Sequence, residues 1–271
     1  MTTVADAFAR AAAEDRAALI AYLPAGFPDR DTSVRLIRAL TESGADMIEV
    51  GIPYSDPLMD GPVICQAAEI ALAAGTTTED AIDVVAEVSD SDAAVLMMTY
   101  WNLVDHFGAE RFAQRLAAAG GAGTITPDLT PEEGARWISA CDALGLSHVF
   151  LAAPSTTDER LPIVVGAASG FVYAASVMGV TGARASVGDR AQELVARLRA
   201  VTDLPVAVGI GVSNAEQAHE VATYADGVIV GSAFVRAVLD APDPDAAVAA
   251  VSALAGELRS AVGRHTGGES R

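Results

Sequence analysis

Lysine is missing from this chain of 271 residues, in which all 17 basic residues are arginines. The absence excludes enzymes that need a lysine amine at the reacting centre. Schiff-base aldolases, pyridoxal phosphate enzymes with an internal aldimine and Walker A nucleotidases all belong to that group. Any chemistry must therefore come from carboxylates, hydroxyls and backbone amides.

Positive charge of any kind is scarce, because 17 basic residues face 36 acidic ones and the formal net charge is −19. Such a surface repels phosphate backbones and anionic lipids, so we expect neither nucleic acid nor membranes as partners. No run of 18 apolar residues occurs and the first 23 residues are acidic, which argues against a membrane span or a signal peptide.

Cysteine and histidine are also rare. Cys65 and Cys141 are too few and too far apart for a disulfide framework or a CxxC motif, which favours a reducing cytoplasm. The four histidines are scattered singly, without the spacing of a metal cluster. We therefore expect no metal site.

What is present is a regular alternation of short apolar runs and helix-period segments. The expected strands span residues 18–23, 47–51, 95–100, 123–126, 148–152, 171–174, 206–208 and 227–230. Amphipathic stretches between them include residues 32–43, 109–119, 131–144, 189–200 and 214–223. Eight strand–helix units in about 250 residues predict a closed (β/α)8 TIM barrel, with a doubly wound open sheet as the alternative.

The ends of the chain complete this organisation. Residues 4–13 predict an extra N-terminal helix that plugs the bottom of the barrel. Residues 264–271 predict a flexible C-terminal tail. We thus expect one catalytic domain over residues 1–263.

An acidic loop after the second strand, with the sequence EVGIPYSDPLMDGP over residues 49–62, is the richest candidate site. Glu49 lies within an apolar strand, and Asp56 and Asp60 follow in a loop that three prolines stiffen. One interpretation is a structural glutamate that pairs with an arginine or caps neighbouring amides. The other is a pair of carboxylates whose pKa values are pushed apart for acid/base work, and the loop favours it.

Two glycine-rich loops follow the seventh and eighth strands and open helices. Gly211 lies in the first, and Gly231 and Ser232 lie in the second. Loops at these two positions of a barrel commonly bind phosphate through backbone N–H groups. The alternative is a pair of ordinary helix caps, formed by Asn214 and Ser232.

Two further features are ambiguous from the residues alone. Residues 176–186 are long and glycine-hinged, which is typical of either a lid or a passive surface loop. Tyr22, Tyr100 and Tyr173 fall near strand ends, where they line a pocket or simply belong to the core.

Several motifs together resemble the alpha subunit of tryptophan synthase, over about residues 18–238. They are the 49–62 loop, AAGT at 73–76, MTYWN at 98–102, APST at 153–156, GVTG at 179–182 and VGSA at 230–233. The 49–62 loop carries the specificity, because a generic phosphate-binding barrel has no proline-bracketed acidic loop there.

The resemblance implies cleavage of indole-3-glycerol phosphate to indole and glyceraldehyde 3-phosphate, a retro-aldol reaction without a cofactor in this subunit. Glu49 matches the family's acid/base, which protonates indole C3 and takes the proton of the adjacent hydroxyl. Asp60 matches the carboxylate that accepts the ring N–H as positive charge develops there.

The same resemblance implies contacts with the rest of the substrate. Its substrate-binding positions are Tyr22, Tyr100, Tyr173, Thr181 and Ile210, and its phosphate-binding positions are Gly182, Gly211, Gly231 and Ser232. Thr181 matches a lid residue that bonds the Asp60 position on closure. Tyr22 and Ile210 stand where some family members have phenylalanine.

The family works as an alpha2beta2 complex with a beta subunit that carries pyridoxal phosphate and consumes the indole. The resemblance therefore implies such a partner. Two alternatives stay open: a non-catalytic barrel that activates a beta subunit, and a stand-alone lyase that releases indole. Intact Glu49 and Asp60 argue against the first. Indole-3-glycerol phosphate synthase is a third possibility, but its reaction resembles one that needs a catalytic lysine.

Overall fold

The computed structural model describes residues 1–175, 187–209 and 211–264. Its eight strands are all parallel and pair in chain order, with β8 closing on β1. They are β1 (Ala18–Pro24), β2 (Met47–Gly51), β3 (Ala94–Met98), β4 (Gly123–Ile125), β5 (Ser147–Ala152), β6 (Val172–Ala175), β7 (Val206–Gly209) and β8 (Gly227–Val230). The predicted TIM barrel is confirmed.

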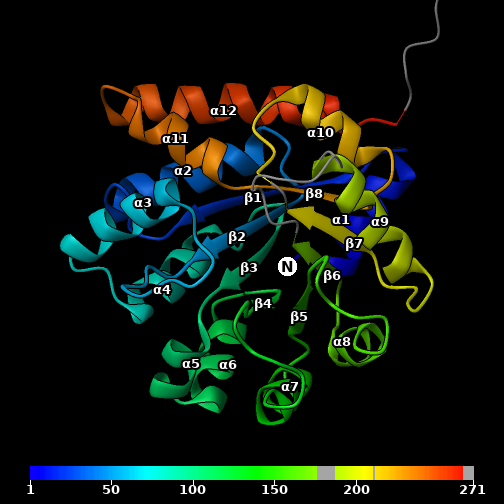
Figure 1. Cartoon of the computed structure of the whole chain (residues 1–271). Coiled ribbons are helices and arrows are strands. Elements are labelled where there is room, and N and C mark those ends of the chain that lie inside the picture. The colour runs from blue at the N-terminus through cyan, green and yellow to red at the C-terminus, as the bar shows by residue number, and fades with distance from the viewer. Residues whose placement is uncertain (176–186, 210, 265–271) are drawn as a thin grey trace, which may run out of the picture.

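Helices surround this barrel, as Figure 1 shows. They are α1 (Val4–Ala13), α2 (Arg30–Glu42), α3 (Pro62–Ala73), α4 (Thr78–Val88), α5 (Trp101–Phe107), α6 (Ala109–Ala118), α7 (Ala135–Asp142), α8 (Leu161–Ala167), α9 (Val187–Arg199), α10 (Ala215–Ala222), α11 (Ser232–Leu239) and α12 (Pro244–Ala261). Side chains cap several of them at their first turn. Asp29 accepts from Thr32 N, and Asn214 accepts from Gln217 N.

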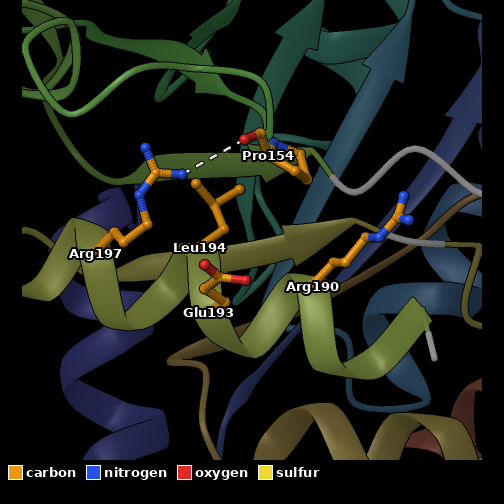
Figure 2. A pocket seen from close by; sticks show the side chains of 5 residues that line it. All are labelled: Pro154, Arg190, Glu193, Leu194 and Arg197. Atoms are coloured by element: carbon orange, nitrogen blue, oxygen red, sulfur yellow. Dashed lines mark hydrogen bonds between the residues drawn. The ribbon is translucent and has the colours of Figure 1, made fainter. Parts of the chain in front are cut away.

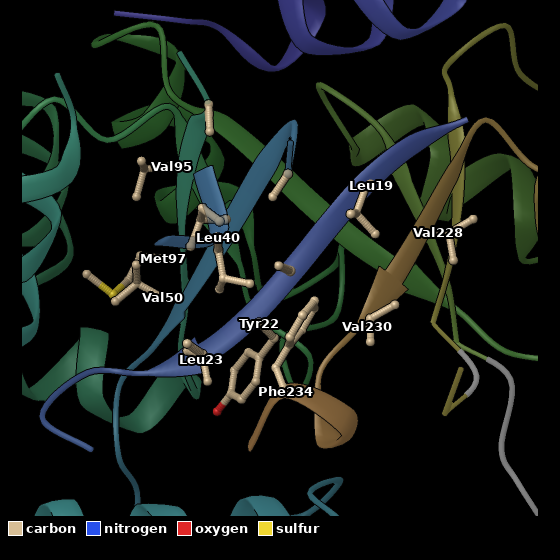
Figure 3. Packing of buried hydrophobic residues seen from close by; sticks show 14 of the residues in the cluster. Leu19, Tyr22, Leu23, Leu40, Val50, Val95, Met97, Val228, Val230 and Phe234 are labelled. Carbon is tan, nitrogen blue, oxygen red and sulfur yellow. The ribbon is translucent and has the colours of Figure 1, made fainter. Parts of the chain in front are cut away.

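Two apolar layers hold the barrel together. Because side chains alternate along a strand, one set faces the helices and the other fills the interior. Leu19 on β1 and Phe234 on α11 belong to the outer layer, part of which Figure 3 shows. Ile20 and Met47 belong to the inner one. Glu49 comes two residues after Met47, so the same alternation turns its side chain inward.

The extra N-terminal helix closes the bottom of the barrel, as the sequence predicts. Its Phe8 packs edge-on against Phe171, with ring centroids 5.7 Å apart, and its buried face joins the inner layer. Thr3 and Asp6 form a capping box that starts this helix at Val4. The amino-terminal end of the barrel is therefore filled by α1.

A buried ion pair lies at the same end. Both guanidinium Nη atoms of Arg16 bond the carboxylate of Asp46, at 2.5 and 2.8 Å, and both side chains are almost fully buried. Arg16 also forms a bridge with Gly263, which joins the end of the barrel to its start.

Arg264, the first residue of the predicted C-terminal tail, is packed against the barrel. Arg264 N donates to the Asp15 carbonyl at 3.1 Å, and its guanidinium donates to the carbonyls of Ala222 and Ala225. These three hydrogen bonds hold Arg264 against the barrel. Residues 265–271 of the predicted tail lie outside the described residues.

Candidate active site

Glu49 lies near the carboxyl end of β2 and is 1% exposed. Its Oε1 atom has no hydrogen-bond partner within the described part of the chain. Burial alone raises the pKa of this carboxyl to about 8, since a charge in this apolar setting loses its hydration. Among the described residues no arginine forms a salt bridge with Glu49, whereas Arg16 pairs with Asp46. The described residues thus offer no ion-pair partner for Glu49.

Asp60 lies in the loop between β2 and α3, where it is partly buried. Burial raises the pKa of its carboxyl, and a hydrogen bond with Tyr100 acts in the opposite direction. The Tyr100 hydroxyl also accepts from Met59 N at 3.1 Å, so it ties this loop to the end of β3. The tilted ring of Tyr54 stacks beside Tyr100, with centroids 5.1 Å apart.

Tyr22 and Tyr173 complete the group around the two carboxyls. Burial raises the pKa of each hydroxyl well above its usual value, and the nearby charges of Asp60 and Glu49 add to the shift. Tyr22 stands opposite Glu49 in the β1–β2 register. The structure therefore brings both carboxyls and all three predicted tyrosines together at the open end of the barrel.

Each of the two strand tyrosines lies over a glycine of the next strand. A Cβ atom added at Gly51 would lie 2.4 Å from the Tyr22 hydroxyl oxygen, and one at Gly209 would lie 2.3 Å from that of Tyr173. Neither glycine is among the predicted site residues. A glycine inside an apolar strand is the signal that could have identified them, because it often marks a close approach.

The two predicted phosphate loops lie at the ends of β7 and β8. Gly211 has a φ of +63°, in the left-handed region that glycine adopts without strain. Asn214 does cap α10, but α11 is capped by Gly231 without a side-chain bond, so Ser232 is not the cap. Within the described residues, the first turn of α11 therefore has no side-chain cap.

Three predicted site residues cannot be placed. Thr181, Gly182 and Ile210 lie outside the described residues. The candidate lid at residues 176–186 lies outside them as well.

Comparisons with known proteins address the identity of this barrel. The family model described as tryptophan synthase alpha chain matches residues 8–263. The tryptophan synthase alpha chain of Thermobifida fusca is 57% identical over 265 residues, which cover 97% of this chain and 98% of that one. The Streptomyces avermitilis alpha chain is 56% identical over 260 residues, with 96% and 94% covered.

The fold agrees with these matches. A solved structure of Mycobacterium tuberculosis tryptophan synthase superposes with a TM-score of 0.89 at 48% identity, covering 97% of this chain and 99% of that one. This chain belongs to the tryptophan synthase alpha chain family. The resemblance inferred from the motifs is confirmed.

This alpha chain also has a cavity that is not lined by Glu49 or Asp60. It measures about 250 Å³ and is lined by Pro154, Arg190, Glu193, Leu194 and Arg197 (Figure 2). Arg197 is already engaged there, since its Nε donates to Asp158 Oδ1 at 2.7 Å. None of the predicted site residues lines this cavity, so it is distinct from the candidate active site.

Within residues 1–175, 187–209 and 211–264, no group of three or more His, Cys, Asp or Glu side chains is arranged to hold a metal ion. None of the described helices is long and apolar enough to cross a membrane.

Proposed function

We propose that Glu49 and Asp60 carry out the family's reaction in this chain, the cleavage of indole-3-glycerol phosphate to indole and glyceraldehyde 3-phosphate. The chain is a carbon–carbon lyase of tryptophan biosynthesis. The observation that carries the proposal is the buried Glu49 carboxyl at the open end of the barrel, with one oxygen unpaired and its pKa raised to about 8. Residues 1–263 form its single catalytic domain, and Arg264 packs against the end of that domain.

Glu49 acts first as an acid and then as a base. With a pKa of about 8 it is mostly protonated at neutral pH, so it can give a proton to indole C3. The bond between C3 and the glycerol carbon then breaks, and its electron pair returns to the neutral indole ring. The Glu49 carboxylate takes the proton of the hydroxyl on that carbon as the aldehyde forms. Glu49 therefore gives up one proton and recovers one proton in each catalytic cycle.

Asp60 stabilises the charge that appears between these two steps. Protonation at C3 makes the ring nitrogen cationic, and an ionised carboxylate that accepts its N–H favours that state. Tyr100 supports this role, because its hydrogen bond favours the charged form of Asp60. Thr181 would add a hydrogen bond to Asp60, as the family resemblance implies.

The remaining contacts divide between the two ends of the substrate. Tyr22, Tyr100 and Ile210 contact the indole part, and Tyr173 contacts the glycerol part. The phosphate is bound by the backbone amides of Gly182, Gly211, Gly231 and Ser232. An amide-lined site explains how a chain of net charge −19 without lysine holds an anion.

The partner is a tryptophan synthase beta subunit in an alpha2beta2 complex. The similarity of this chain to a solved tryptophan synthase of Mycobacterium tuberculosis supports a beta-subunit partner. This chain needs no cofactor of its own, and pyridoxal phosphate belongs to the beta subunit. We place the complex in the cytoplasm, where free thiols such as Cys65 and Cys141 stay reduced.

The test is the release of indole from indole-3-glycerol phosphate, with and without a cognate beta subunit. Indole release by this chain that beta accelerates supports the proposal. Equal rates with and without beta indicate a stand-alone lyase. No indole in either case, with beta activated, indicates a non-catalytic activator and contradicts the proposal.

A further inference from the structure

Tyr22 lies in a slot between two glycines, one on each side of β1. A Cβ atom at Gly51 on β2 would lie 2.4 Å from the Tyr22 hydroxyl oxygen and 2.7 Å from both Cε2 and Cζ. A Cβ at Gly231, after β8, would lie 3.3 Å from Tyr22 Cδ1. Approaches below 3.0 Å to a ring force something to move, so the ring takes this position only because residue 51 lacks a side chain.

The backbone gives no other reason for a glycine at position 51. Gly51 is the last residue of β2 and does not have the positive φ that favours glycine, unlike Gly211. A glycine within a strand costs about 0.5–1 kcal/mol relative to alanine. It commonly marks a place where another group approaches the backbone closely. Here that group is the Tyr22 ring.

The slot places Tyr22 beside the carboxyl that the proposed reaction uses. Tyr22 pairs with Glu49 in the β1–β2 register, and its side chain is only 8% exposed. Gly51 follows Glu49 by two residues, so the two lie on the same face of β2. The ring therefore crosses β2 directly beyond Glu49.

We propose that Gly51 is a positioning residue for this lyase: it leaves the space in which the Tyr22 ring lies over β2 and forms a wall for the indole ring beside Glu49. The proposal rests on the proposed function, and it adds a requirement that the family's acid/base roles do not contain. Gly51 acts through Tyr22 and touches no reacting atom.

The test is a double-mutant cycle on kcat/KM for indole-3-glycerol phosphate, with wild type, Gly51→Ala, Tyr22→Leu and the double variant. Gly51→Ala is expected to lower kcat/KM by about 10- to 100-fold, because small displacements near the reacting atoms are costly. Leucine ends before the ring atoms Cε2 and Cζ that clash. In the Tyr22→Leu background the added methyl group should therefore cost less than about threefold.

Two controls separate positioning from general damage. Gly256→Ala, where an added Cβ meets nothing within 4 Å, should leave kcat/KM unchanged. Glycerol 3-phosphate lacks the indole ring, so its affinity by calorimetry should be the same in wild type and Gly51→Ala. A merely structural loss would weaken both ligands.

Equal losses from Gly51→Ala in both backgrounds would overturn the proposal, and so would full activity of the single variant. If Gly51→Ala does not fold, the double variant with Tyr22→Leu decides the question. Recovery of cooperative unfolding in the double variant supports the proposal. A double variant that also fails to fold contradicts the proposal. Failure of the proposed function is recognised separately, since the wild type would then release no indole.

Discussion

Asp46, directly before β2, and Glu49, within β2, are two buried carboxyls only three residues apart, and their surroundings give them opposite properties. Asp46 is neutralised by Arg16 and bonds Leu19 N, whereas one oxygen of Glu49 has no partner among the described residues. A buried carboxyl without a counter-charge holds its proton to high pH. The proposed chemistry depends on this difference.

The first prediction concerns the proton that Glu49 carries. Glu49→Gln keeps the size and the neutral state of the side chain, so the fold and ligand binding should persist, while turnover falls by roughly 100-fold or more. Indole release under saturating substrate measures the effect. Glu69→Gln on the exposed side of α3 is the matched control and should leave turnover unchanged. Near wild-type turnover in Glu49→Gln would remove Glu49 from the mechanism.

The second prediction links the same group to stability. The pKa of Glu49 rises from 4.5 to about 8 on folding, so its protonation stabilises the fold fully below about pH 4.5. That contribution is lost as pH rises through about 8. The free energy of unfolding of wild type should therefore fall by a few kcal/mol relative to Glu49→Gln between about pH 5 and pH 9. Urea unfolding of both proteins across this range measures it, and a constant difference would show that the carboxyl titrates normally.

At the scale of elements, strand positions followed from the sequence more closely than helix boundaries did. The segments 47–51 and 227–230 agree with β2 and β8 at both ends. The predicted strand 95–100 instead ends at Met98, because Tyr100 turns to become the N-cap of α5. The helix predicted at 131–144 begins only at Ala135, after a turn in which Gly134 N bonds the Thr130 carbonyl.

The third prediction tests the loop that leads into α10. Gly211→Asp puts a carboxylate beside the proposed phosphate site, and Gly211→Ala imposes the same strain at a φ of +63° without the charge. Affinity for glycerol 3-phosphate should fall at least about tenfold further for aspartate than for alanine, because like charges repel at close range. Calorimetry on both variants measures the difference. Equal affinities would place the phosphate elsewhere.

At the scale of the whole molecule, the composition and the alternation of segments already predict a barrel with its site at one end. They do not predict contacts that depend on side-chain placement in space. The Arg16–Asp46 pair joins residues 30 positions apart in the sequence. The close approach of Tyr22 to Gly51 joins the neighbouring strands β1 and β2. Both require the strand register, which the apolar pattern of fully buried parallel strands leaves open.

The fourth prediction concerns the closure of the barrel at its bottom. Asp46→Asn leaves the Arg16 guanidinium without its buried carboxylate, and breaking such a pair costs about 3–5 kcal/mol of unfolding free energy. Denaturant unfolding measures this cost. Asp245→Asn removes the partner of Arg35 at the surface and should cost less than about 1 kcal/mol. Similar small losses in both variants would show that the buried pair contributes little.

The absence of lysine has a practical consequence for the assembled enzyme. Reagents that acylate or cross-link amines find no lysine side chain in residues 1–271. In a mixture with a lysine-bearing beta subunit, an amine-reactive dye would label that subunit's side chains and leave those of the barrel dark. If the beta subunit is labelled before this chain is added, changes in the dye's fluorescence would report assembly from the beta side.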